Sequence, residues 1–171
     1  MKRRALYLAI GLFAGLGLSA VGLKAHILLP HKPGQTADWV KKMRVEDYGR
    51  QQVIYHIDQS AGVLNGHYRH VLQVAKNHVD AVGADKLDLR IILQGEGVDF
   101  LSWARGSFDA RHKIDELKLQ GVKFLVCRNT LLARGIDPDR ELYDVQKEDV
   151  VRTAVGEIAQ LEQKGFQYIK P

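Results

Sequence analysis

Short apolar runs alternate with helical repeats of apolar residues through most of this chain. Runs rich in β-branched and apolar residues predict strands over residues 52–57, 87–93, 122–126, 142–145 and 166–169. Apolar residues that recur every three or four positions predict helices over residues 64–82, 98–104, 109–119, 128–134 and 150–161. Strands that alternate with helices pair in parallel through right-handed crossovers. We therefore predict a doubly wound, mainly parallel α/β sheet over residues 52–171.

The first 51 residues have a different pattern. Three cations, Lys2, Arg3 and Arg4, precede an uncharged run from Ala5 to Leu23, which is typical of a secretory signal or a membrane anchor. About 20 apolar residues suffice to span a bilayer, so an uncleaved anchor over residues 1–25 is favoured over a removed signal peptide. A buried helix of the domain itself fits this charge pattern less well. In either favoured case the folded domain is periplasmic or otherwise outside the cytoplasm.

Residues 26–51 form a polar stem between this segment and the domain. Pro30, Pro33 and Gly34 interrupt regular structure there, and a short helix is expected around residues 38–45. The chain thus divides into an N-terminal segment (1–25), a stem (26–51) and one α/β domain (52–171). About 120 residues are enough for one hydrophobic core.

Charge and composition narrow the function classes. The 171-residue chain has a net charge of +5, but Lys2, Arg3, Arg4 and Lys24 supply four of these charges, so the remainder carries +1. The domain therefore lacks the basic surface that nucleic-acid binding needs. The single cysteine excludes a disulfide framework and a cysteine-based zinc site. No metal is expected from the histidines of the second predicted element, which do not converge on one face: His67, His70 and His78.

The one cysteine, Cys127, lies where the third predicted strand passes into a helix that begins Arg128-Asn129-Thr130. In a parallel α/β sheet, ligands bind beyond the carboxyl ends of the strands. Unpaired N–H groups at a helix N-terminus, together with the Arg128 guanidinium, favour thiolate over thiol. Cys127 is therefore the candidate nucleophile, with Arg128, Asn129 and Thr130 as candidate anion-binding residues. The alternative is a buried cysteine that only fills space in the core.

Two other strand ends carry candidate residues. Gly95-Glu96-Gly97 follows the second strand, but the third glycine of a dinucleotide motif would fall at Phe100, so no nucleotide cofactor is expected. Gly95 and Gly97 are predicted to permit a tight turn at the rim of a substrate pocket. His56 and Asp58, at the end of the first strand, are predicted to reach the same crevice as Cys127.

Three stretches of the chain resemble one known family. They are KFLVCRNTLLARGI at residues 123–136, QGEGVDFL at residues 94–101, and the C-terminal EIAQLEQKGFQYIKP. Together they resemble the DsrE/DsrF-like family, in particular its exported members, and the resemblance runs from about Gln52 to Pro171. It implies a flavodoxin-like or Rossmann-like sheet, assembly into trimers or hexamers, and a cysteine that carries sulfur as a persulfide. Only Cys127 matches the sulfur-bearing position.

These observations lead to one expected function and two alternatives. The first is an exported protein that binds or transfers sulfane sulfur on Cys127, with donor and acceptor proteins or small polysulfides as partners. The second is a non-catalytic, oligomeric accessory subunit of a membrane redox or sulfur-metabolism complex. The third is a small-ligand-binding module at the Gly95 loop. No cofactor is expected in any of them.

Overall fold

The computed structural model describes residues 36–43 and 46–171. The predicted membrane anchor or signal peptide lies outside these residues. The chain separates into two compact units, Met1–Arg44 and Val45–Pro171. In the described part of the first unit, the short helix α1 (Asp38–Lys41) stands where the stem is predicted to hold one, and it buries no side chain. None of the helices in the described residues combines the length and the apolar character that a bilayer crossing requires.

The second unit is built on a five-stranded sheet in the order β4-β3-β2-β1-β5. Every neighbouring pair of strands is parallel. The strands are β1 (Gln51–Ile57), β2 (Leu87–Leu93), β3 (Lys123–Cys127), β4 (Val150–Val151) and β5 (Gln167–Ile169). The predicted parallel α/β fold is thereby confirmed.

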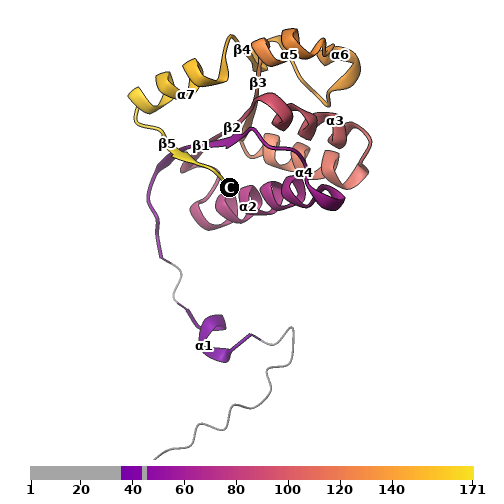
Figure 1. Ribbon diagram of the computed structural model, residues 1–171. Coiled ribbons are helices and arrows are strands. Elements are labelled where there is room, and N and C mark those ends of the chain that lie inside the picture. Colours follow the sequence, from indigo (N-terminus) through magenta and orange to yellow (C-terminus); the bar gives the residue numbers. More distant parts are fainter. Residues whose placement is uncertain (1–35, 44–45) are drawn as a thin grey trace, which may run out of the picture. The chain divides into compact units, whose positions relative to one another are not determined.

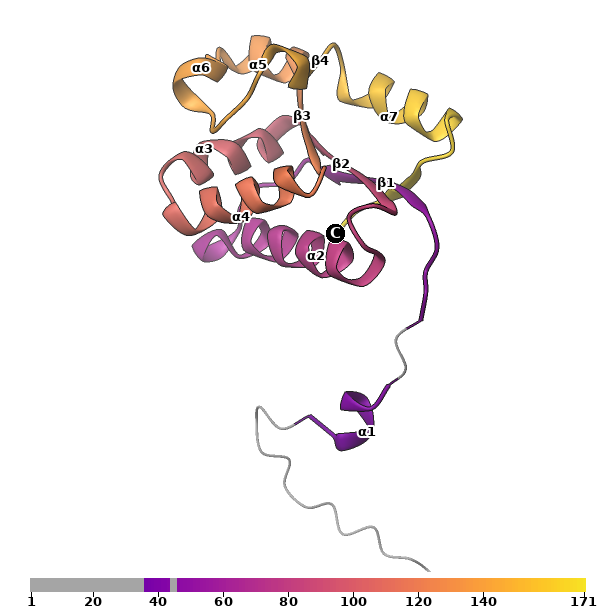
Figure 2. The ribbon, with the colours of Figure 1, turned by 180° about the vertical axis from the view of Figure 1, so that it is seen from behind.

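Helices cover both faces of this sheet. Figures 1 and 2 show α2 and α4 on one side and α7 on the other. The α-helices of this unit are α2 (Gly66–Val82), α3 (Asp99–Arg105), α4 (Phe108–Leu119), α5 (Arg128–Arg134), α6 (Pro138–Glu141) and α7 (Ala154–Gln163). Single 3-10 turns stand at Val63–Asn65, Gly95–Val98 and Lys147–Asp149.

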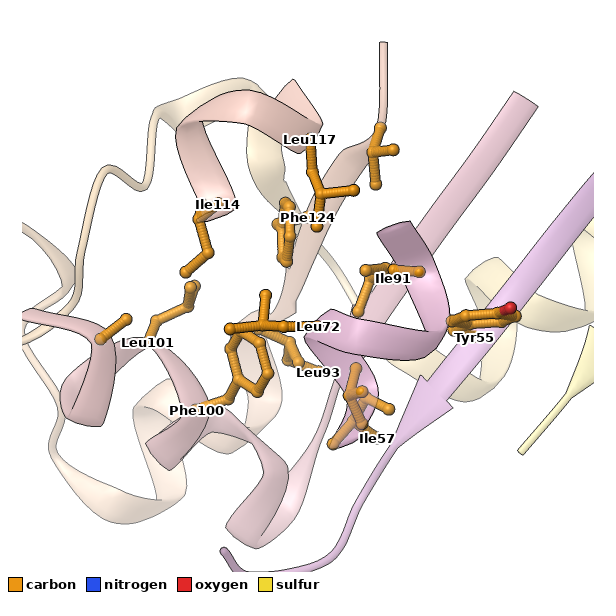
Figure 3. Packing of buried hydrophobic residues seen from close by; sticks show 14 of the residues in the cluster. Tyr55, Ile57, Leu72, Ile91, Leu93, Phe100, Leu101, Ile114, Leu117 and Phe124 are labelled. Carbon is orange, nitrogen blue, oxygen red and sulfur yellow. The ribbon is translucent and has the colours of Figure 1, made fainter. Parts of the chain in front are cut away.

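The two faces have cores of unequal size, and the alternation of strand side chains separates them. On β1, Tyr55 and Ile57 point into the larger core, whereas Ile54 points into the smaller one. In the larger core the rings of Phe100 and Phe124 pack beside the side chains of α2 and α4 (Figure 3). The smaller core lies under α7 and consists of Ile54, Ile92, Leu125, Cys127, Ala154, Ile158, Leu161 and Phe166.

The predicted strand over residues 142–145 is wrong. Leu142 is buried because it packs into the larger core, and the backbone N–H of Tyr143 donates to the Leu101 carbonyl at 3.2 Å. Asp144 has a φ of 47°, which no strand accommodates. The edge strand is instead Val150–Val151, so the predicted helix start at residue 150 is also wrong. Paired β-branched residues fit an edge strand as well as a helical stripe.

The chain leaves β3 and β4 toward opposite faces of the sheet. After β3 it enters α5, whose Leu131 packs into the larger core, and after β4 it enters α7 above the smaller core. Cys127 and Val151, the last residues of these strands, are paired in register. A parallel sheet forms a crevice between two strands whose connections diverge in this way. Cys127 lies at this position of the sheet and is buried there.

Candidate functional site

Three connections meet at the carboxyl edge of the sheet. Ile57 of β1 pairs with Leu93 of β2, and Leu93 pairs with Val126 of β3. The next residues, Asp58, Gln94 and Cys127, therefore lie side by side across the sheet. The predicted site residues thus come from adjacent strand ends, with Cys127 nearest the crevice.

The sulfur of Cys127 is buried between the beginnings of two helices. Cys127 directly precedes α5, and its side chain is 3% exposed. The backbone N–H of Ala154, the first residue of α7, donates to Cys127 Sγ at 3.4 Å. The preceding Thr153 makes no side-chain cap, and the sulfur accepts from one of the N–H groups at the start of α7 that have no partner within the helix.

These donors outweigh the effect of burial on the thiol. Burial raises the pKa of Cys127, but hydrogen bonds from the N–H of Ala154, from the N–H and hydroxyl of Thr130 and from the N–H of Asn129 together bring it below its ordinary value. Each donor stabilises the anion more than the neutral thiol. The geometry therefore favours the nucleophilic thiolate form.

The three residues after Cys127 differ in their surroundings. Arg128 and Asn129 are exposed, and no side-chain contact of Arg128 contributes to the pKa of Cys127. Thr130 is 8% exposed, and its Oγ1 accepts a hydrogen bond from the Gly95 N–H at 3.0 Å. The Thr130 hydroxyl also lowers the pKa of Cys127, so this side chain affects both the glycine turn after β2 and the thiol.

The glycine turn is fixed by steric contact. A Cβ atom at Gly97 would stand 2.0 Å from the Ile57 carbonyl oxygen, so only glycine fits against the end of β1. Gly95 has a φ of 56°, the left-handed conformation that glycine adopts without strain. Arg134 Nη1 donates to the Gly95 carbonyl at 2.8 Å, and its Nη2 pairs with Asp99 at 2.8 Å. The turn is therefore in contact with the end of β1 on one side and with α5, the helix after β3, on the other.

His56 and Asp58 are tied to the C-terminal residues of the chain. His56 Nδ1 hydrogen-bonds Tyr168 Oη at 2.9 Å. Asp58 forms an ion pair with Lys170 Nζ at 2.9 Å. Burial lowers the pKa of His56, and the hydrogen bond from Lys170 lowers the pKa of Asp58. At neutral pH His56 is therefore mainly uncharged and Asp58 is anionic.

His56 and Cys127 share a face of the sheet but are not adjacent. His56 pairs with Ile92 on β2, and Ile92 pairs with Leu125 on β3. Two strand spacings, about 10 Å, therefore separate β1 from the strand that ends in Cys127. Gln94 lies between them, and its Oε1 and His56 Nε2 are both buried without a hydrogen-bond partner.

Four residues at the site are absent from the sequence prediction. The Ala154 N–H and the Arg134 side chain lie 27 and 39 residues from their partners, while Tyr168 and Lys170 lie 112 residues from theirs. Only Ala154 had a local signal, because a threonine stands just before it at the start of an amphipathic helix.

No cluster of three or more histidine, cysteine, aspartate or glutamate side chains that might hold a metal occurs in the part of the chain that the structure describes. The ring of His78 forms hydrogen bonds with side chains of β1. It lies between Tyr55 Oη at 2.9 Å and Gln51 Oε1 at 2.7 Å, on the face opposite Cys127.

Comparison with known proteins shows which family this chain belongs to. The chain is similar to MTH1491 of Methanobacterium thermoautotrophicum, a solved protein of unknown function, with 30% identity and a TM-score of 0.59. The match covers 71% of this chain and 99% of MTH1491. Among curated proteins, none matches this chain at a significant level. The sequence profile of the DsrE/DsrF-like family matches residues 65–171, which include the glycine turn, Cys127 and the whole of α7. This protein is therefore a member of the DsrE/DsrF-like family.

Proposed function

We propose that this protein carries sulfane sulfur as a persulfide on Cys127. Membership of the DsrE/DsrF-like family indicates a role related to sulfur relay. The observation that carries the finer proposal is the hydrogen bonding of Cys127 Sγ by the first N–H of α7 together with donors from α5. A sulfur carrier needs a cysteine that is ionised near neutral pH, and this arrangement favours ionisation.

The proposed reaction is a pair of exchange steps. The Cys127 thiolate attacks the outer sulfur of a donor persulfide R–S–SH, the donor S–S bond breaks, and R–S⁻ leaves. Cys127–S–SH is then attacked at its outer sulfur by an acceptor thiolate, and Cys127 leaves as thiolate. Neither step changes the total oxidation state. Because Cys127 is the only cysteine of the chain, release as an internal disulfide is excluded and the acceptor is a separate molecule.

The surroundings of the reaction form part of the proposal. The basic flank and the uncharged run of residues 5–23 support a position outside the cytoplasm, tethered to the membrane. The family resemblance supports a homo-oligomer, a trimer or hexamer, whose partners are sulfur donors and acceptors or small polysulfides. Cell fractionation and light scattering on the purified full chain test these two statements.

The burial of Cys127 favours a second candidate function. A thiol that is 3% exposed and packed in the smaller core is also consistent with a purely structural cysteine. The protein would then be a non-catalytic accessory subunit of a larger assembly.

Intact-mass spectrometry separates the two functions. The folded wild-type protein and its Cys127→Ser variant are exposed to polysulfide, freed of excess reagent and weighed. Wild type is expected to gain whole sulfur atoms that dithiothreitol removes, while the variant gains none. Absence of any gain on folded wild type would refute sulfur carriage and support the accessory subunit. Circular dichroism of both proteins establishes that the variant is folded.

A further inference from the structure

Cys127 is buried, and the start of α7 contributes to its cover. The thiol is 3% exposed, and the atom donating to its sulfur is the backbone nitrogen of Ala154. Ala154 begins α7, and α7 leads directly into β5, the last strand. We call α7 and β5 together, residues 154–169, the cover segment. Because Cys127 is 3% exposed, a reagent or partner thiol needs a movement of the surrounding chain to reach it.

The cover segment is held by few contacts at its C-terminal end. Four of its residues enter the smaller core: Ala154, Ile158, Leu161 and Phe166. Its strand makes three residue pairs, all with β1, and each of its residues is exposed. Elements with few buried contacts open at lower free energy than the global unfolding of a protein. The cover segment is therefore expected to open at a lower free energy than the whole domain unfolds.

Two side-chain contacts, from Tyr168 and from Lys170 just after the cover segment, hold its C-terminal end. Lys170 Nζ donates a hydrogen bond to Asp58 Oδ2 at 3.0 Å and lies 2.9 Å from Asp58 Oδ1 as an ion-pair contact. Tyr168 Oη lies 2.9 Å from His56 Nδ1, and the two rings meet edge to face. His56 belongs to β1, and Asp58 belongs to the loop that follows it. We call these two contacts the latch.

We propose that the latch controls access to Cys127, with Tyr168 and Lys170 as positioning residues that hold the cover segment over the thiol. When the latch and the three residue pairs between β5 and β1 open together, α7 separates from the smaller core. The Ala154 N–H then leaves the sulfur, and a sulfur donor or acceptor reaches it. The biological purpose rests on the proposed function of Cys127, but the opening itself is a property of the fold.

The sole cysteine makes this opening measurable without any sulfur transfer. Folded full-chain protein reacts with 5,5′-dithiobis(2-nitrobenzoate), and the rate reports how often Cys127 is exposed. Lys170→Met and Tyr168→Phe each remove one latch contact and are expected to increase that rate about fivefold. Lys164→Met is the matched control, because Lys164 follows α7, is exposed, and its side chain makes no hydrogen bond or ion pair with the described residues. Its rate is expected to equal that of wild type.

Hydrogen exchange identifies what opens. In wild type, the free energy that protects Cys127 from the reagent is expected to match that of amides in α7 and β5 and to lie below that of α2. Latch variants are expected to accelerate α7 and β5 amides by the same factor as the thiol. Unchanged thiol rates in both latch variants, or a Cys127 protection equal to that of α2, would overturn the proposal. The reactivity and exchange measurements form no persulfide. Their outcome therefore does not depend on whether the sulfur-loading experiment succeeds.

Discussion

Thr130 is expected to be the side chain whose loss affects the site most selectively. Thr130→Val keeps the size of the side chain but removes the hydroxyl that accepts from the Gly95 N–H at 3.0 Å. The Gly95 N–H is then left without its partner in a part-buried place, which destabilises the fold by about 1.5 kcal/mol. The same hydroxyl lowers the pKa of Cys127, so the pKa of the thiol is expected to rise.

Both effects can be measured on one protein. Urea unfolding gives the free energy, and the ultraviolet absorbance of thiolate followed against pH gives the thiol titration, which has a single source because the chain has one cysteine. Thr130→Ser is the control, since it retains the hydroxyl and is expected to keep the wild-type titration. If Thr130→Val titrates like wild type, the Thr130 hydroxyl does not stabilise the thiolate, and the account of the site given above is incorrect.

Two further predictions concern the glycine turn and the linkage of ionisation to folding. Gly97→Ala is expected to lower the free energy of unfolding by about 3 kcal/mol or more, because its Cβ would stand 2.0 Å from the Ile57 carbonyl oxygen. Gly66→Ala, at an open position of α2, is expected to leave urea stability unchanged or raise it by up to about 1 kcal/mol, and equal losses in both variants would contradict the steric argument. The folded-state pKa of Cys127 lies below its unfolded value, so ionisation adds stability that is complete above the unfolded pKa, about 8.5, and is lost as pH falls through the folded pKa. Wild type measured against Cys127→Ser is therefore expected to gain stability as pH rises toward 9, whereas a constant difference would show that the folded protein does not favour the thiolate.

Most of the sheet could be predicted from the sequence because its strands are marked by local patterns. Residues 87–93 and the glycine turn after them form β2 and its turn as expected. The edge strand was misplaced because two adjacent valines, Val150 and Val151, are too short a run to show a period. Strand pairing with Val126 and Cys127 decides their conformation, and that pairing is a tertiary contact.

The site was predictable only where chemistry and local structure coincide. Cys127 was found from its place between a strand and a helix, and this is where the structure has it. The Ala154 N–H and the two latch contacts come from segments 27 and 112 residues away. Nothing local in residues 168–170 indicates that they would meet the end of the first strand. Such contacts follow from the strand order, which places β5 beside β1.

The burial of Cys127 has a further consequence for the oxidation of its sulfur. Peroxides convert accessible thiolates first to sulfenic acid and then irreversibly to sulfinic and sulfonic acids. With no second cysteine to trap the sulfenic acid as a disulfide, a permanently open Cys127 would lose its sulfur chemistry after two oxidation events. A thiol that is 3% exposed meets dissolved peroxide only during openings. If Cys127 carries sulfur as proposed, the burial that slows its partners thus also lengthens the chemical lifetime of its thiol.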